Sequence, residues 1–247
     1  MRATRETNTG VTTRMRGALA AAGLLFAAMT LSACSLIPPS ASPIPPAASQ
    51  ESAVPTITGL GTVEVNSYKG KKLDLVSSEP ENSIKGPQHV NTLTYRLVVK
   101  GEVATPLSLK YNEVIAMPSF KKATTLNCVE GWSKTYLWQG VRIKDLLTKA
   151  GYDPSAKVVI FTAADGYTTS LPLDYIVNND ILLAYEMNGV VIPPERGFPF
   201  QVVAQDRFGY KWAKWVTSIE VSDDANYQGY WEQRGYDNSA TLPGGSN

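Results

Sequence analysis

Short apolar runs separated by turn residues constrain the fold of this chain more than any other feature. Runs rich in β-branched and aromatic residues are typical of strands, and we expect strands over residues 93–100, 123–128, 157–162, 182–187, 199–204 and 215–221. Helical spacing occurs over residues 112–116 and 141–150, and Gly151 is placed to end the second helix. Many short strands with a few short helices predict an α+β fold with mixed β-sheets.

The first 34 residues predict export rather than a folded element. Arginines precede an apolar run over residues 17–30, which is too short to span a bilayer and is followed by small residues, as in a signal peptide. The ending Leu31-Ser32-Ala33-Cys34 resembles a bacterial lipobox. It implies that Cys34 is acylated and anchors the mature lipoprotein to a membrane, outside the cytoplasm. An ordinary cleaved signal peptide is the alternative.

Composition shifts divide the rest of the chain. Residues 35–55 are rich in Pro, Ser and Ala, which predicts an extended linker without a core. Residues 56–237 suit one domain. Residues 238–247 form a short polar tail that we expect to be loose.

The charged and histidine content excludes several classes of function. A net charge of +1 over 247 residues argues against nucleic acid as a partner. The single histidine, His89, argues against His-ligated haem, a His-rich zinc site and a Ser-His-Asp triad. The chemistry must therefore use cysteine, carboxylates, lysine or arginine, or a bound cofactor.

Cys128 is the most informative single residue, because the only other cysteine is Cys34 of the export signal. A lone thiol in an exported domain is open to oxidation unless it is buried or ligated. The neighbouring Glu130, Gly131 and Trp132 favour a site. On these residues alone two readings stay open, a metal ligand or nucleophile and a small buried hydrophobe.

A later segment, residues 207–215, combines three cations with four aromatic residues and a glycine. Backbone amides near a glycine, together with Lys and Arg, can hold a phosphate, and aromatic faces can pack beside a flat heterocycle. The alternative is a strand whose Trp215 packs inward and whose lysines are solvated.

Five stretches in order resemble the molybdopterin-binding oxidoreductase domain of the sulfite oxidase family. They are residues 81–88, 126–132, 164–167, 193–199 and 209–215, within a resemblance that covers about residues 64–238. The resemblance is greatest to small bacterial and archaeal members that consist of this domain alone. The resemblance implies a sulfite-oxidase-type fold and a molybdenum–molybdopterin cofactor.

The resemblance also implies roles for two residues near the metal. Cys128 matches the protein's ligand to molybdenum, and a soft thiolate suits a metal in a sulfur-rich sphere. Glu130 matches a carboxylate beside the metal, where it would relay protons or orient a loop. The implied activity is two-electron oxygen-atom transfer on a small oxo-anion or an S- or N-oxide, with a separate electron donor or acceptor protein.

The family's contacts to the cofactor are matched less completely in this sequence. Asn82 matches an asparagine that approaches the cofactor, and Lys85 and Gly86 lie next along the chain. Further expected contacts, for the phosphate above all, are Lys211, Trp212, Ala213 and Lys214. The chain departs from the family's pattern at Ala163, Arg196 and Gln201, and Arg196 or Arg207 would restore the lost cation.

These departures support an alternative function. The export signal contains Arg14-Met15-Arg16 rather than two adjacent arginines, although such enzymes usually leave the cytoplasm already folded around their cofactor through a twin-arginine signal. The domain would then be a cofactor-free surface module that binds a ligand or partner in the same cleft. Cys128 would be a partly exposed thiol in a setting that favours the thiolate.

Overall fold

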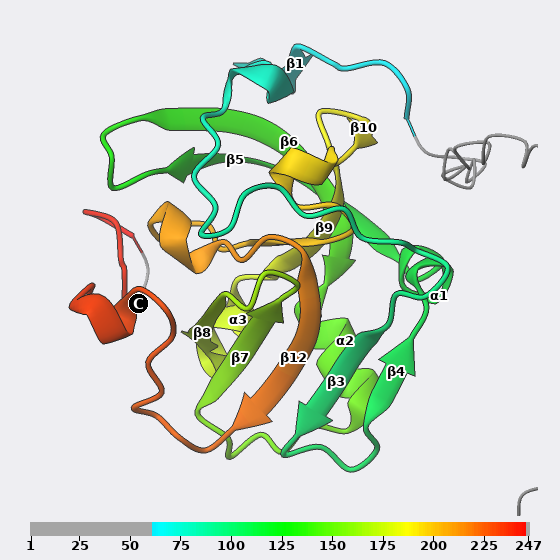
Figure 1. Cartoon of the computed structure of the whole chain (residues 1–247), viewed down its shortest axis with the longest axis vertical. Coiled ribbons are helices and arrows are strands. Elements are labelled where there is room, and N and C mark those ends of the chain that lie inside the picture. The colour runs from blue at the N-terminus through cyan, green and yellow to red at the C-terminus, as the bar shows by residue number, and fades with distance from the viewer. Residues whose placement is uncertain (1–60, 246–247) are drawn as a thin grey trace, which may run out of the picture. The chain divides into compact units, whose positions relative to one another are not determined.

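The computed structural model describes residues 61–245 (Figure 1). The predicted signal peptide, Cys34 and the linker lie outside the described residues. Within the described part, no helix is long and apolar enough to cross a membrane.

Two five-stranded sheets make up most of the domain. The first has the order β10-β9-β6-β5, and β11 also pairs with β9. All of its pairs are antiparallel. Its strands are β5 (Ser119–Asn127), β6 (Ser133–Arg142), β9 (Leu182–Met187), β10 (Val190–Val191) and β11 (Gln201–Val203).

The second sheet has the order β4-β3-β12-β7-β8. The central pair β3 and β12 is parallel, whereas the other pairs are antiparallel, so this sheet is mixed. Figure 1 shows these strands side by side in the lower half of the view. They are β3 (Leu97–Gly101), β4 (Leu107–Leu109), β7 (Val158–Ala163), β8 (Thr168–Pro172) and β12 (Val216–Ser222).

The remaining elements are short. The hairpin β1 (Ser67–Tyr68) and β2 (Lys71–Lys72) precedes the sheets. The α-helices are α1 (Tyr111–Ile115), α2 (Ile143–Ala150) and α3 (Leu173–Asn178). The 3-10 turns are η1 (Val76–Ser78), η2 (Pro194–Arg196), η3 (Gly209–Lys211) and η4 (Glu232–Arg234).

Helix α2 joins the two sheets in one core. Its apolar residues Ile143, Leu146, Leu147 and Ala150 are all fully buried, and it contacts β3 of one sheet and β6 of the other. Gly151 ends the helix in the left-handed conformation, at φ 67°, as expected for a glycine at this position.

Strand β6 is the main element that the sequence pattern does not predict. Its Gly140 resembles a turn residue, but a Cβ there would lie 2.1 Å from the Leu183 carbonyl oxygen of β9. Glycine is therefore needed for close approach of two strands rather than for a turn. The preceding residues, including the fully buried Trp138, extend the strand through the first sheet.

The expected loose tail is instead packed, as far as the structure describes it. The Phe208 N–H donates to the Ala240 carbonyl at 2.9 Å, and Leu242 N–H donates to the Asp206 carbonyl at 3.0 Å. Ala240 is 1% exposed. The packed domain therefore extends past residue 237.

Candidate active site

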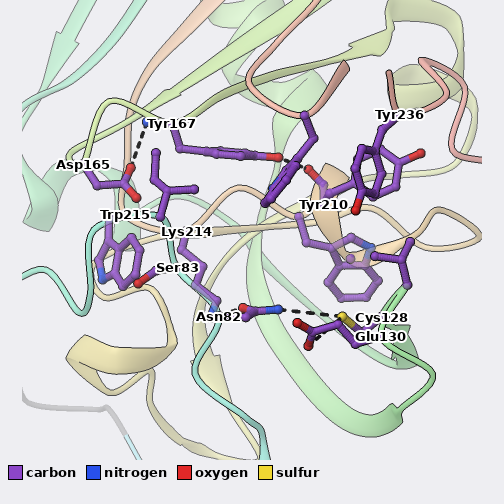
Figure 2. Close-up of a pocket in the computed structure, with 15 residues that line it drawn as sticks. Asn82, Ser83, Cys128, Glu130, Asp165, Tyr167, Tyr210, Lys214, Trp215 and Tyr236 are labelled. Carbon is purple, nitrogen blue, oxygen red and sulfur yellow. Dashed lines mark hydrogen bonds between the residues drawn. The ribbon is translucent and has the colours of Figure 1, made fainter. Parts of the chain in front are cut away.

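A pocket of about 150 Å³ collects segments that are far apart in the sequence (Figure 2). It lies where the end of β5, the loop after η1, the β7–β8 turn and η3 meet residues that follow β12. Its lining residues are Asn82, Ser83, Ile84, Cys128, Val129, Glu130, Asp165, Tyr167, Gly209, Tyr210, Trp212, Lys214, Trp215, Trp231 and Tyr236.

A tight turn at the end of β5 presents Cys128 to this pocket. The Cys128 N–H donates to the Trp132 carbonyl at 2.9 Å, and the Cys128 carbonyl accepts from Gly131 N–H at 3.1 Å. Gly131 has φ +90°, and a Cβ added there would meet no atom within 4 Å, so glycine is required by the backbone and not by crowding. The turn leaves Cys128 9% exposed.

Two polar side chains contact the thiol (Figure 2). Asn82 Nδ2 donates to Cys128 Sγ at 3.8 Å, and Sγ donates to Glu130 Oε2 at 3.6 Å. Trp132 Nε1 also donates to Glu130 Oε2, at 3.1 Å. Cys128, Glu130 and Asn82 are therefore brought together, as the resemblance implies.

The surroundings of Cys128 hold its thiol in the protonated form. Burial raises the pKa of Cys128, and the Glu130 carboxylate raises it further, whereas the Glu130 backbone N–H and the Asn82 amide lower it. This corrects the sequence-based expectation that the protein alone would favour a thiolate. A metal cation at Sγ would supply the missing positive charge.

Lys214 is a further charged residue near Asn82. Its Nζ lies 3.4 Å from Asn82 Oδ1 and 3.6 Å from Glu79 Oε1. The next residue, Trp215, has φ +52°, a conformation that is costly for a bulky side chain. Trp215 N–H donates to the Gly197 carbonyl at 3.2 Å, and its carbonyl accepts from Ala164 N–H at 2.9 Å.

Aromatic rings form much of the remaining wall. Trp212 is 3% exposed and packs on Trp138 with ring centroids 5.7 Å apart. The Tyr167 hydroxyl donates to the Tyr210 carbonyl. Tyr236 contacts Tyr210 edge-on at a centroid distance of 5.2 Å.

Other residues expected at the cofactor do not line the pocket. Lys211 is 0% exposed and pairs with Glu232, and its Nζ also donates to the Ser170 carbonyl and to Asn238 Oδ1, both at 3.1 Å. Lys211 is thus a buried partner of the C-terminal segment and does not line the pocket.

The remaining expected contacts surround the pocket without lining it. Arg196 is buried, with Nη1 3.8 Å from Glu79 and 3.3 Å from the Pro80 carbonyl. Ala213 is buried, and its carbonyl accepts from Val202 N–H at 2.9 Å. Lys85 Nζ lies beside the turn at Gly166, 3.3 Å from the position that a Cβ on residue 166 would occupy. Gly86 adopts a positive φ of +77° and does not line the pocket.

Several lining residues were missed by the sequence reasoning. Ser83 follows Asn82 and has a buried Oγ with no hydrogen-bond partner among the described residues. Trp231 and Tyr236 come from the end of the chain, where polar composition predicts a boundary.

A metal at this pocket would need ligands beyond the protein. In residues 61–245 no group of three or more His, Cys, Asp or Glu side chains could hold a metal ion. A site with a single protein thiolate therefore requires a cofactor that supplies the other ligands.

Comparison with known proteins decides the family. The model for the oxidoreductase molybdopterin binding domain matches residues 84–231. This chain belongs to that family. The oxidoreductase YuiH of Bacillus subtilis is 38% identical over 151 residues, which cover 61% of this chain and 76% of YuiH.

Two further relatives are matched over a smaller share of their length. A putative protein-methionine-sulfoxide reductase subunit, YedZ1 of Azospira oryzae, is 33% identical over 60% of this chain and 56% of its own length. The mitochondrial sulfite oxidase of Homo sapiens is 30% identical over 58% of this chain and 32% of its own length. This chain thus spans only part of both relatives.

A solved structure confirms the predicted fold class. The sulfane dehydrogenase SoxCD from Paracoccus pantotrophus superposes with a TM-score of 0.54 over 57% of this chain and 41% of that chain, at 24% identity. This likeness concerns the fold, and it agrees with the mixed sheets and short helices described above.

The residues that line the pocket fit a molybdenum–pterin group. Cys128 supplies a soft ligand, Lys214 a cation for a phosphate, and the buried Ser83 Oγ lacks a partner in the described part of the chain. Tyr167, Trp212 and other rings offer flat surfaces for a heterocycle.

Proposed function

We propose that this chain is a mononuclear molybdenum oxidoreductase that carries out two-electron oxygen-atom transfer. The observation that carries the proposal is the Cys128 thiol, held in the pocket between the Asn82 amide and the Glu130 carboxylate. Cys128 would ligate the metal and Lys214 would hold the cofactor phosphate. The bound cofactor would supply the redox chemistry, while the protein orients it and controls access.

Glu130 is the residue placed to handle protons. Its Oε2 already accepts hydrogen bonds from the Cys128 thiol and from Trp132 Nε1, so the carboxylate is fixed at the pocket wall. A carboxylate within hydrogen-bond reach of the reacting atoms can take up or deliver a proton there. Trp132 thus holds this carboxylate in place.

The substrate is a small oxo-anion or an S- or N-oxide. Support comes from the names of two relatives, one a sulfite oxidase and the other a methionine-sulfoxide reductase subunit. Electrons pass to or from a separate donor or acceptor protein. The description of YedZ1 as a subunit supports this arrangement.

The enzyme is held outside the cytoplasm by a lipid on Cys34. The sequence Leu31-Ser32-Ala33-Cys34 supports this location. Membrane fractionation of the full chain and of Cys34→Ala tests it. The wild type should sediment with membranes and the variant should be released, whereas equal retention of both would contradict the anchor.

Metal and pterin analysis tests the enzyme itself. The full chain, produced in a host that makes molybdopterin, should contain stoichiometric molybdenum and release a fluorescent pterin on denaturation. Cys128→Ser should lose the molybdenum, and Cys34→Ser, the same chemical change in the export signal, should keep it. Absence of molybdenum and pterin from the wild type would overturn the proposal and favour the cofactor-free binding module.

A further inference from the structure

We infer that the substrate is an uncharged S-oxide or N-oxide with an apolar substituent rather than a small oxo-anion, and that Trp231 and Tyr236 select it. This inference rests on the proposed function and narrows its substrate class. It follows from two features of the pocket, the few positive charges and the aromatic wall.

The charges inside the pocket do not suit a small anion. Among the described lining residues Lys214 is the only cation, whereas Glu130 and Asp165 are both carboxylates. Lys214 also lies 3.6 Å from Glu79, and a cofactor phosphate would use what remains of its charge. An oxo-anion would therefore enter a pocket whose nearest charges repel it.

Lys85 lies exposed at the Gly166 turn and does not line the pocket, and three further cations near the pocket have buried partners of their own. Lys211 pairs with Glu232, and both side chains are 0% exposed. Arg196 contacts Glu79 and a backbone carbonyl. Arg207 donates to a threonine hydroxyl at 2.7 Å and lies over a tyrosine ring at 4.2 Å. Each is buried among its own partners, so none can turn into the pocket without leaving a buried group unpaired.

The second feature is a wall of aromatic rings beside the pocket. Tyr236 contacts both Trp231 and Tyr210, with ring centroids 5.1 and 5.2 Å apart, and Figure 2 shows Tyr210 and Tyr236 grouped above Cys128. Tyr236 is 38% exposed, so the wall reaches solvent. Ring faces and edges attract apolar groups and sulfur.

This wall belongs in part to the chain's own C-terminal segment. Tyr236 lies beyond residues 84–231, the part that matches the family. The segment is fixed by Glu232, which accepts hydrogen bonds from Lys211 and from Thr169 Oγ1, the latter at 2.8 Å. Substrate selection would thus depend in part on Tyr236, which lies outside the family-matched region.

The reaction balances with the electron donor already proposed. A sulfoxide, two electrons and two protons give a thioether and water, as the sulfur–oxygen bond breaks. The donor protein supplies the two electrons, and Glu130 is placed to pass protons. In the assay reduced viologen replaces the donor.

Binding of inert analogues tests the selection without turnover. Methyl phenyl sulfone is neutral and sulfate is an anion, and each is titrated calorimetrically into the purified full-length protein. We expect the sulfone to bind at least about 10-fold more tightly than sulfate. Tyr236→Ala should weaken sulfone binding about 3- to 10-fold, while the matched change Tyr68→Ala, on β1 outside the pocket, should leave it unchanged.

Turnover separates this inference from the proposed function. The loaded enzyme should reduce methyl phenyl sulfoxide with a higher kcat/KM than it shows for oxidation of sulfite by ferricyanide. Preference for sulfate and sulfite in molybdenum-containing protein would overturn the inference and leave the proposed function standing. Absence of molybdenum from the wild-type protein, together with tighter binding of the sulfone than of sulfate, would overturn the proposed function and leave the pocket's preference standing.

Discussion

Breaking the buried pair between Lys211 and Glu232 should destabilise the domain strongly. Both side chains are 0% exposed, so removing one charge leaves the other buried without a counter-charge. Such a loss costs about 3–5 kcal/mol. The affected hydrogen bonds include those from Lys211 to Ser170 and Asn238, so the C-terminal segment should loosen first.

The magnitude can be measured with a double-mutant cycle. Lys211→Met and Glu232→Gln should each lower the free energy of unfolding by about 3–5 kcal/mol in urea titrations, or the melting temperature by roughly 6–20 °C for a domain of this size. The double variant buries no charge, and it should be more stable than the sum of the single effects by at least about 2 kcal/mol.

A surface pair provides the matched control. Lys100 and Glu220 are 2.9 Å apart, with side chains 49% and 38% exposed. Lys100→Met and Glu220→Gln should each cost less than about 1 kcal/mol. Single-variant costs at Lys211 and Glu232 as small as these, or costs that simply add in the double variant, would refute the reasoning.

Three further predictions concern two glycines and one buried carboxyl group. Gly131→Ala should cost roughly 1–2 kcal/mol in urea denaturation, because it strains a positive φ without a clash; an unchanged stability would contradict this. Gly140→Ala should cost roughly 3 kcal/mol or more, because its Cβ would meet the Leu183 carbonyl at 2.1 Å. Burial raises the pKa of Glu79 above its ordinary value, more than its cationic neighbours lower it. Stability should therefore fall as the pH rises above the ordinary pKa of 4.5 and through the raised pKa of Glu79. Over that interval Glu79→Gln should become more stable relative to wild type in a pH series of denaturation curves.

Sequence patterns predict elements whose signal is local. The strand expected over residues 182–187 matches β9, and the helix expected over residues 141–150 is found from Ile143. Strand β6 was missed because Gly140 resembles a turn residue. A glycine is needed there because the backbone of β9 passes close by. Such a close approach between distant backbones leaves no pattern of its own along the chain.

The candidate site also has a part that the local sequence predicts and a part that depends on distant residues. A short motif around Cys128 placed the thiol and Glu130 together, since both lie in one turn. It could not distinguish Lys211 from Lys214, which are three residues apart. The difference is set by Glu232, 21 residues beyond Lys211, because a buried carboxylate pairs with one lysine and leaves the other at the pocket.

The parallel pairing of β3 with β12 also sets the order in which the domain can assemble. The Tyr95 hydroxyl donates to the Val216 carbonyl across 121 residues, and Lys214 reaches Asn82 across 132. While the chain is being synthesised, β3 has an unpaired edge and the pocket lacks a side until the last strand has left the ribosome. The pocket can therefore receive a ligand only in an almost complete chain, and a chain truncated before β12 would lack this site.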